Sequence, residues 1–276
     1  LEEYYGSEIN LTQALTDKAL KALDYPIRKK EPFYLYMSHY GVHTPIHEEP
    51  QFYQKYLDAG LEERTAMYAS MVESVDESLG QILDFLEEKG IADNTIIIFY
   101  SDNGGHSLNT AKNSVAHTFN APLREGKGSV YEGGVRVPLM FYWPGRTAAG
   151  VRVNTPVMPE DFYPTILEMA GVKEYRTVQE LDGQSMVKLI TDGSQLAAEA
   201  MRRGEIADQR AANAFVIPAS VSGIDPERAV ISHMPHQWRI EDQEDVDFLS
   251  AVRKGDWKLV YRMHDAKLEL YNLKTD

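Results

Sequence analysis

Residues 95–105, TIIIFYSDNGG, decide the fold class of this 276-residue chain. The β-branched and aromatic run at 95–100 is typical of a central strand of a parallel sheet, buried on both faces. The run leads directly into Asp102 and Asn103, followed by two glycines. In open α/β sheets, ligands bind outside the carboxyl ends of the strands. The stretch therefore predicts a central strand with a candidate site at its tip.

Helix and strand patterns alternate along the chain as far as about residue 170. Apolar residues at helical spacing predict helices over 12–24, 64–89 and 161–169, with Asp161 as the cap of the third helix. Apolar runs predict strands over 33–38 and 137–143. This alternation indicates an α/β layer with a mainly parallel central sheet.

The patterns change in the last third of the chain. A helix is predicted over 195–203, a short strand over 229–232, and an antiparallel hairpin from 257–262 and 268–272. We therefore expect two domains, an α/β domain over 1–190 and a small α+β lobe with an antiparallel sheet over 191–276.

Charge and composition exclude several classes of protein. The formal net charge is −14, from 28 basic and 42 acidic residues, so the basic face of a nucleic-acid-binding protein is not expected. An anionic substrate would have to be held by a few local cations or a metal. The chain has no cysteine, which excludes disulfides and cysteine-based zinc sites. No apolar run reaches the roughly 18 residues that span a bilayer.

Asp102 and Asn103 form the first candidate site. A carboxylate beside an amide oxygen suits a hard cation such as Ca²⁺ or Mg²⁺. The same residues also fit a simple glycine-rich turn, because Asp-Asn-Gly-Gly is a favourable turn sequence.

His43 is the second candidate. It follows the predicted strand at 33–38, so it could meet Asp102 at the same edge of the sheet, where an imidazole binds an anionic oxygen or protonates a leaving group. A hydrogen-bonded loop histidine is the alternative interpretation.

Lys127, between Gly126 and Gly128, is the third candidate. Glycines allow the backbone to approach a ligand closely, and Arg124 lies three residues earlier, so both cations could hold an oxyanion. The alternative is a solvated loop cation. The P-loop pattern is absent.

Two further groups of residues accompany these candidates. Glu132 and Arg136, four residues apart just before a strand, are expected to form a buried pair that shapes the site. In the small lobe, the segment 233–238 (HMPHQW) either reaches over the cleft or lies on the surface. We assign His106, Arg124 and His236 as candidate substrate contacts.

Taken together, the motifs resemble the sulfatase family. They occur in that family's order over nearly the whole chain: 43–45 (HTP), 101–104 (SDNG), 126–128 (GKG), 131–138 (YEGGVRVP), 143–145 (WPG), 161–165 (DFYPT), 255–259 (GDWKL) and 269–273 (ELYNL). Each motif is short, and the specificity comes from their order and spacing.

The resemblance implies an alkaline-phosphatase-like α/β sandwich with a small antiparallel lobe. It implies that Asp102 and Asn103 ligate a divalent cation, usually Ca²⁺ with Mg²⁺ as the alternative. It further implies that Lys127 and His43 are catalytic and contact the sulfate group. The family's nucleophile is a formylglycine made from a C/S-x-P-S-R motif, which does not occur in these 276 residues.

The implied function is a sulfuric ester hydrolase that cleaves a sulfated sugar or an aryl sulfate. We expect this chain to be the C-terminal part of such an enzyme, inactive by itself, with the formylglycine upstream. The resemblance also implies an enzyme located in the periplasm or outside a bacterial cell. A phosphodiesterase or phosphonate hydrolase of the same superfamily is one alternative, and a non-catalytic fragment is the other.

Overall fold

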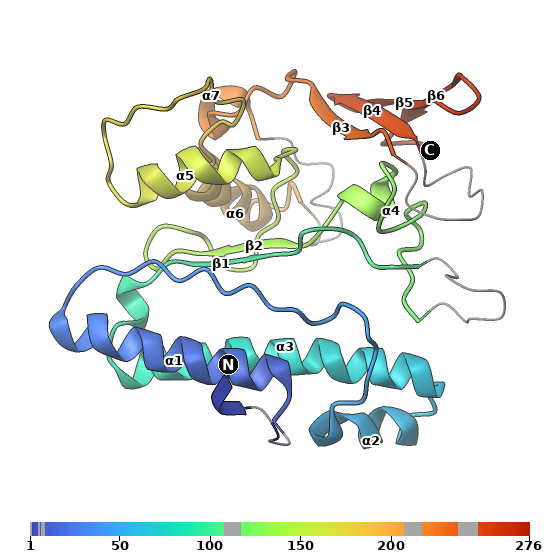
Figure 1. Ribbon diagram of the computed structural model, residues 1–276. Coiled ribbons are helices and arrows are strands. Elements are labelled where there is room, and N and C mark those ends of the chain that lie inside the picture. The colour runs from blue at the N-terminus through green and yellow to red at the C-terminus, as the bar shows by residue number, and fades with distance from the viewer. Residues whose placement is uncertain (1, 5, 7–8, 108–116, 207–216, 237–247) are drawn as a thin grey trace. The chain divides into compact units, whose positions relative to one another are not determined.

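The computed structural model describes all residues except 1, 5, 7–8, 108–116, 207–216 and 237–247 (Figure 1). The chain divides into two compact units. Unit 1 comprises Leu1–Thr95 and His106–Phe119, and unit 2 comprises Ile96–Gly105 and Asn120–Asp276. The boundary at 190/191 stays a prediction.

Unit 1 is helical. Its elements are η1 (Glu2–Tyr4), α1 (Leu11–Lys29), α2 (Pro50–Asp58), α3 (Glu63–Glu88) and η2 (Ala92–Asn94). The predicted helices at 12–24 and 64–89 are therefore confirmed, the first continuing five residues further. Helix α2 was not predicted.

Helices α1 and α2 both pack against α3 (Figure 1). Small side chains of α3 lie at the contact, where the buried Ser78 hydroxyl bonds the Thr16 hydroxyl of α1 at 2.6 Å. Asn10 caps α1 by accepting the backbone N–H of Gln13 at 2.7 Å. Gly90, with φ 67°, follows the last turn of α3, the position where glycine commonly ends a helix.

The strand predicted over 33–38 is not formed within the described residues. The side chains alternate between half-buried and exposed, as in an extended chain, and Tyr34 and Tyr36 are 69% and 77% exposed. A strand needs a hydrogen-bonded neighbour as well as a suitable sequence, and no neighbour in the described chain pairs with this run. The prediction was therefore wrong for this part of the chain.

Unit 2 contains every described strand and several short helices. They are β1 (Ile97–Tyr100), α4 (Glu132–Val135), β2 (Leu139–Tyr142), η3 (Pro159–Asp161), α5 (Phe162–Met169), η4 (Leu189–Gly193), α6 (Ser194–Arg202), α7 (Ala219–Ser222), β3 (Val230–Met234), β4 (Leu249–Lys254), β5 (Trp257–Arg262) and β6 (Lys267–Asn272). The predicted elements at 95–100, 137–143, 161–169 and 195–203 correspond to β1, β2, α5 and α6.

Strands β1 and β2 pair antiparallel, with Ile97 opposite Tyr142 and Tyr100 opposite Leu139. We expected parallel pairing of a fully buried strand, and the described pairing corrects this for β1, which is half-buried. A parallel neighbour needs a crossover connection, usually a helix, whereas β1 and β2 are joined by a glycine-rich segment whose described part holds only the single turn of α4.

The larger core of unit 2 lies between β2 and the helical segments that follow it. Buried Met186, Leu189 and Ile190 pack with Ala197 of α6, and Phe141 of β2 lies against them. The apolar residues of η4 and α6 recur at helical spacing, which places them on one face. This core holds the end of β2 in place.

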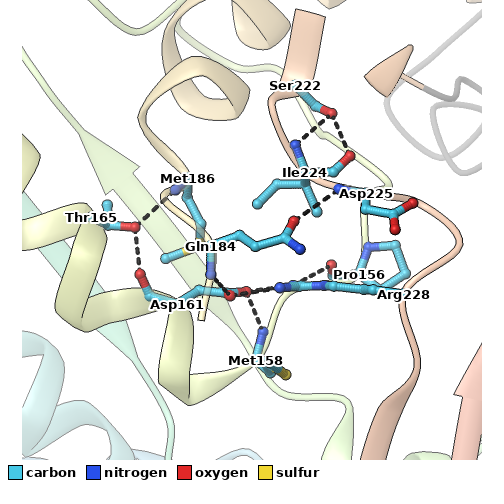
Figure 2. Close-up of polar contacts among 10 residues, drawn as sticks. All are labelled: Pro156, Met158, Asp161, Thr165, Gln184, Met186, Ser222, Ile224, Asp225 and Arg228. Carbon is cyan, nitrogen blue, oxygen red and sulfur yellow. Dashed lines mark hydrogen bonds and ion pairs between the residues drawn. The ribbon is translucent and has the colours of Figure 1, made fainter. Parts of the chain in front are cut away.

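A buried ion pair between Asp161 and Arg228 joins distant segments of unit 2 (Figure 2). The carboxylate of Asp161 is fully buried and accepts two hydrogen bonds from the Arg228 guanidinium, one of them at 2.7 Å. It also accepts the backbone N–H groups of Met158 at 2.9 Å and Gln184 at 2.8 Å. The guanidinium donates further to the Pro156 carbonyl oxygen at 3.1 Å. The buried carboxylate thus has hydrogen bonds to both oxygens, as its stability requires, whereas the buried Nε of Arg228 has no partner among the described residues.

Asp161 occupies the N-cap position of α5, as predicted, but the capping role expected of its side chain is not confirmed. Its side chain makes no capping bond to α5, because Arg228 and two loop N–H groups occupy its oxygens. The Asp161 carbonyl oxygen accepts the Thr165 hydroxyl, which in turn accepts the Met186 N–H at 2.8 Å. The Gln184 side chain accepts the N–H of Asp225 at 2.9 Å (Figure 2).

Strands β3, β4, β5 and β6 form an antiparallel sheet in that order, drawn in orange and red in Figure 1. The predicted strand at 229–232 and the hairpin of β5 and β6 are confirmed, and β4 was missed. One face buries Leu249, Ala251 and Val260 against Val130 and Tyr131. The sheet therefore packs on the segment just before α4.

Among the described helices, none combines the length and the apolar character needed to cross a membrane.

Candidate functional site

The site begins in the loop after β1. Asp102 is exposed and Asn103 is half-buried. The Ser101 hydroxyl donates to the Asn103 carbonyl oxygen at 3.0 Å, and the Asn103 side-chain nitrogen donates to the Gly104 carbonyl oxygen at 2.9 Å. Because the amide nitrogen is used within the loop, the amide oxygen of Asn103 is left to act beside the Asp102 carboxylate.

Gly104 brings this loop against α4, and Gly133 and Gly134 bring α4 against the turn that carries Lys127. The Gly104 N–H donates to the Gly134 carbonyl oxygen at 2.9 Å. A Cβ atom on Gly104 would lie 1.7 Å from the Gly133 oxygen, one on Gly133 would lie 2.1 Å from the Glu125 oxygen, and one on Gly134 would lie 2.2 Å from the Ser129 oxygen. No side chain fits such distances. The glycines of both motifs are therefore required by close backbone contact.

Lys127 lies in the segment that this contact holds. Its N–H donates to the Gly105 carbonyl oxygen at 3.1 Å. The Asn120 side chain joins the same parts: its oxygen accepts the Gly105 N–H at 3.1 Å, and its nitrogen donates to the Gly105 oxygen at 2.8 Å and the Glu125 oxygen at 3.0 Å. The structure thus brings the Lys127 turn and the Asp102 loop into one hydrogen-bonded framework.

The pairing expected between Glu132 and Arg136 is wrong. Glu132 instead forms an ion pair with the buried Lys258 of β5, with Nζ and Oε1 2.8 Å apart, while Arg136 is exposed. Both residues lie at the ends of α4, where the Arg136 N–H donates to the Glu132 carbonyl oxygen. The sequence spacing reflects this helical turn, and the acidic side chain points to a strand that the local pattern could not reveal.

Arg124 lies close to the last strand of the chain. Its guanidinium donates to the Tyr271 hydroxyl at 2.6 Å and lies 3.4 Å from a Glu269 carboxylate oxygen. It also lies over the Tyr131 ring, 4.0 Å from the centroid. These contacts hold Arg124 within unit 2, and its contact with substrate stays a prediction.

His43 belongs to unit 1, and its meeting with the loops of unit 2 stays a prediction. Its side chain is exposed and its Nδ1 lies 2.9 Å from the Thr44 carbonyl oxygen. Side-chain contacts hold the loop around His43 on both sides. His39 forms a 2.8 Å hydrogen bond with the Ser78 hydroxyl, and His47 lies 3.1 Å from a carboxylate oxygen of the buried Glu49. Burial lowers the pKa of His39 and raises that of Glu49, where His47 and Asn10 oppose the rise.

His106 lies in unit 1 beside a histidine that the sequence did not single out. The rings of His106 and His117 are 6.0 Å apart, and His117 is buried against Tyr68 and Arg64. Burial, together with the Arg64 charge, lowers the pKa of His117. This imidazole is therefore predominantly neutral at pH 7, and no local motif distinguishes it in the sequence.

His236 follows β3 and is exposed, and its carbonyl oxygen accepts the Phe248 N–H at 3.4 Å. Trp238, from the same motif, lies outside the described residues. His233 points from β3 to the Ser250 hydroxyl of β4. The role of this motif in substrate binding stays a prediction.

Comparison with known proteins identifies the family. The sulfatase family model matches residues 2–172. The chain belongs to the sulfatase family. A sulfatase of Formosa agariphila is 34% identical over 98% of the chain and 45% of its own length. The N-acetylgalactosamine-6-sulfatase of Mus musculus is 33% identical over 68% of the chain and 34% of its own length.

Solved structures give the same result for the fold of this sulfatase chain. The crystal structure of Ps i-CgsB in complex with k-i-k-neocarrahexaose matches with a TM-score of 0.70 and 27% identity, over 98% of this chain and 51% of that one. The chain thus has the alkaline-phosphatase-like α/β fold of sulfatases. The chain spans about half the length of the Formosa agariphila sulfatase and of Ps i-CgsB.

The sulfatase family implies a divalent cation, so the side chains of the site must offer suitable donor atoms for one. In the described part of the chain, no three His, Asp or Glu side chains cluster as a metal site. Asp102 and Asn103 nevertheless supply two adjacent oxygen donors on a loop fixed by hydrogen bonds from side chains to its backbone. This fits part of the shell of Ca²⁺, which takes six to eight oxygen ligands.

Proposed function

We propose that this chain forms part of a sulfuric ester hydrolase and supplies one half of its anion-binding centre. The observation that carries the proposal is the framework that fixes the Lys127 turn against Gly105, two residues after Asn103. A lysine on a turn that is hydrogen-bonded to the loop of a carboxylate and an amide suits an anion bound through both a metal and an ammonium group. Membership of the sulfatase family supports the assignment of that anion as a sulfate ester.

In this proposal Asp102 and Asn103 hold a divalent cation, Ca²⁺ in preference to Mg²⁺. The cation would supply positive charge for the non-bridging oxygens of the sulfate group. The ammonium of Lys127 stabilises the negative charge that develops on the departing oxygen, and His43 binds that oxygen or gives it a proton. His106, Arg124 and His236 contact the remainder of the substrate.

The nucleophile belongs to another part of the same protein. A formylglycine would supply the attacking hydroxyl group, and the C/S-x-P-S-R motif that encodes it is not among these 276 residues. We accordingly propose that the isolated segment does not turn over substrate. The net charge of −14 gives substrate anions no general attraction, so these few fixed positive groups must select them.

A sulfated sugar is the first choice of substrate, and an aryl sulfate the second. The names of two relatives support the sugar: one is an N-acetylgalactosamine-6-sulfatase, and one was solved with a neocarrahexaose. Such a substrate agrees with an enzyme exported to the periplasm or beyond, as we propose. A phosphodiesterase or phosphonate hydrolase remains the competing hypothesis for the same framework.

The test compares an aryl sulfate with an aryl phosphate, using the full-length protein produced with a formylglycine-generating enzyme. We expect faster turnover of the sulfate. Asp102→Asn and Lys127→Ala should each lower kcat by about 10²–10³-fold, the usual cost of removing a group that stabilises developing charge. Asp93→Asn and Lys254→Ala, at exposed positions outside the framework, are matched controls and should keep full activity. Faster phosphate turnover, or near-normal activity of Lys127→Ala, would reject the proposal.

A further inference from the structure

The loop that carries Lys127 is attached at two points to the C-terminal sheet. Arg124 forms the first attachment, three residues before Lys127, and Glu132 forms the second, five residues after it. Both partners lie on strands beyond residue 172, outside the segment that the sulfatase family model matches.

The first attachment is a compact polar cluster on β6. Arg124 donates to the Tyr271 hydroxyl at 2.6 Å, and its guanidinium lies 3.4 Å from Glu269. Glu269 accepts hydroxyl hydrogen bonds from Tyr131 at 2.7 Å and from Tyr271 at 2.6 Å. Glu269 thus binds both Arg124 and Tyr131, which flank Lys127 in the sequence.

The charge of Glu269 is fixed by this cluster. Its carboxylate is only 11% exposed, and burial alone would raise its pKa. Hydrogen bonds from Tyr131, Tyr271 and Lys267, together with the charge of Arg124, outweigh burial and lower the pKa to about 2. Glu269 is therefore ionised at neutral pH and holds Arg124 as a charge-assisted partner.

The second attachment is the ion pair of Glu132 with Lys258 of β5. Lys258 is 4% exposed, and the distance between its ammonium and the Glu132 carboxylate is 2.8 Å. Next to it, Val130 and Tyr131 are buried against Val260 of the same strand. This end of the loop is therefore fixed by both charge and apolar packing.

Between the attachments, backbone hydrogen bonds hold the Lys127 turn. The Ser129 N–H donates to the Gly126 carbonyl oxygen at 3.1 Å, and the Lys127 N–H donates to the Gly105 oxygen, also at 3.1 Å. At the far end, the Gly133 N–H donates to the Arg124 carbonyl oxygen at 2.8 Å, which closes the loop on itself. A shift of either attachment would thus move the turn as one body.

We propose that Glu269, Tyr271 and Lys258 are positioning residues that set where the Lys127 ammonium stands relative to the Asp102 loop. These three residues of β5 and β6 then support catalysis through the loop that they hold, although they contribute no group to the reacting atoms. This inference rests on the proposed function, in which Lys127 stabilises the departing oxygen.

The test is a double-mutant cycle in the full-length enzyme. Glu269→Gln and Lys258→Met each remove one charge with little change in size, and each is made alone and together with Lys127→Ala. Asp256→Asn is the matched control, because Asp256, in the turn between β4 and β5, forms an exposed ion pair with Lys274 away from the Lys127 loop. Activity is measured with aryl sulfates whose leaving groups differ in pKa, at a temperature where circular dichroism shows every variant to be folded.

Glu269→Gln and Lys258→Met should each lower kcat by roughly 10–100-fold, since a displacement of about 1 Å can cost a hundredfold. KM should stay unchanged in Lys258→Met, whereas Glu269→Gln also disturbs Arg124, a proposed substrate contact, and should raise KM. The loss should be greatest for the poorest leaving groups, and neither change should cost anything further in the Lys127→Ala background. Asp256→Asn should leave kcat unchanged. Should Glu269→Gln fail to fold, Tyr271→Phe removes one hydroxyl and gives the same comparison.

An equal loss with and without Lys127, or no loss in a folded variant, would overturn the positioning role and leave the proposed function intact. A Lys127→Ala enzyme with near-normal activity would overturn the proposed function first, and this inference with it.

Discussion

The buried pair of Asp161 and Arg228 gives the strongest prediction about stability. Asp161→Asn keeps the size of the side chain and removes its charge, which leaves the guanidinium buried without its counterion. Removing one partner of a buried ion pair costs about 3–5 kcal/mol, because the remaining charge stays desolvated. The Asn amide can also satisfy fewer donors than the carboxylate, which accepts two hydrogen bonds from Arg228 and one each from Met158 and Gln184.

This loss is large compared with the whole stability of a folded domain, about 5–15 kcal/mol. For a domain of 150–250 residues, each kcal/mol lowers Tm by roughly 2–4 °C, so Asp161→Asn should lower the apparent Tm by about 6–20 °C. The matched control is Asp24→Asn, which removes the exposed pair of Asp24 and Arg28 in α1 and should cost at most about 0.5 kcal/mol.

The assay is thermal unfolding of the full-length protein, followed by circular dichroism, for both variants, for Arg228→Gln and for the double variant Asp161→Asn with Arg228→Gln. Because the two side chains contact each other, the double variant should lose less than the sum of the single losses, by about 0.5–3 kcal/mol. If Asp161→Asn were as harmless as Asp24→Asn, or if the two losses were additive, the pair would not hold these segments together as argued.

Three further predictions concern the glycine contacts, a helix cap and acid stability. Gly133→Ala should lower the unfolding free energy by at least about 1–3 kcal/mol, since its Cβ would lie 2.1 Å from the Glu125 oxygen. Gly80→Ala, in an open position of α3, should raise it by about 0.5–1 kcal/mol, and equal Tm values for the two variants would contradict the close approach at Gly133. Asn10→Ala should cost at least about 1 kcal/mol in urea unfolding because α1 loses its cap, and an unchanged midpoint would argue against that cap. The pKa of Glu269 is about 2 in the folded protein and 4.5 ordinarily, so the carboxylate stabilises the fold fully above pH 4.5 and loses this effect as the pH falls toward 2. The difference in unfolding free energy between Glu269→Gln and the unmutated protein should therefore shrink over this pH range. A difference that stays constant would contradict the lowered pKa.

The sequence predicted the elements whose patterns are local. The apolar spacing of 64–89 is that of α3, and the β-branched run at 95–100 contains β1. Such patterns depend on which face of an element is buried, and a single segment is enough to show this. The family resemblance, which rests on short motifs in a fixed order, was confirmed by the comparisons.

Pairing between distant segments could not be predicted in the same way. The run at 33–38 has strand-like residues without a described partner strand. The direction of β2 relative to β1 depends on the path of the connecting segment, which the residues of the two strands do not specify. Likewise, the Glu132 side chain has its partner at Lys258, 126 residues away along the chain. Nothing in the residues near Glu132 indicates such a partner.

Within the candidate site, glycine was the most informative residue. The sequence predicts a turn for the pair at 104–105 and gives no role to the glycines at 133–134, and in the structure Gly104, Gly133 and Gly134 are points where two backbones touch. No role was predicted for Asn120, although its amide joins Gly105 to Glu125. An amide clamp of this kind can be recognised only when the three-dimensional neighbours are known.

The backbone contact of Gly104 with Gly133 and Gly134 also bears on protein engineering. Since a Cβ atom on Gly104 would overlap the Gly133 carbonyl group, residues 101–105 and 120–134 fit each other closely and form one exchangeable unit. A chimaera that imports a single half from a relative would bring together two backbones that did not evolve as neighbours, whereas a transplant of both halves carries its own complementary fit.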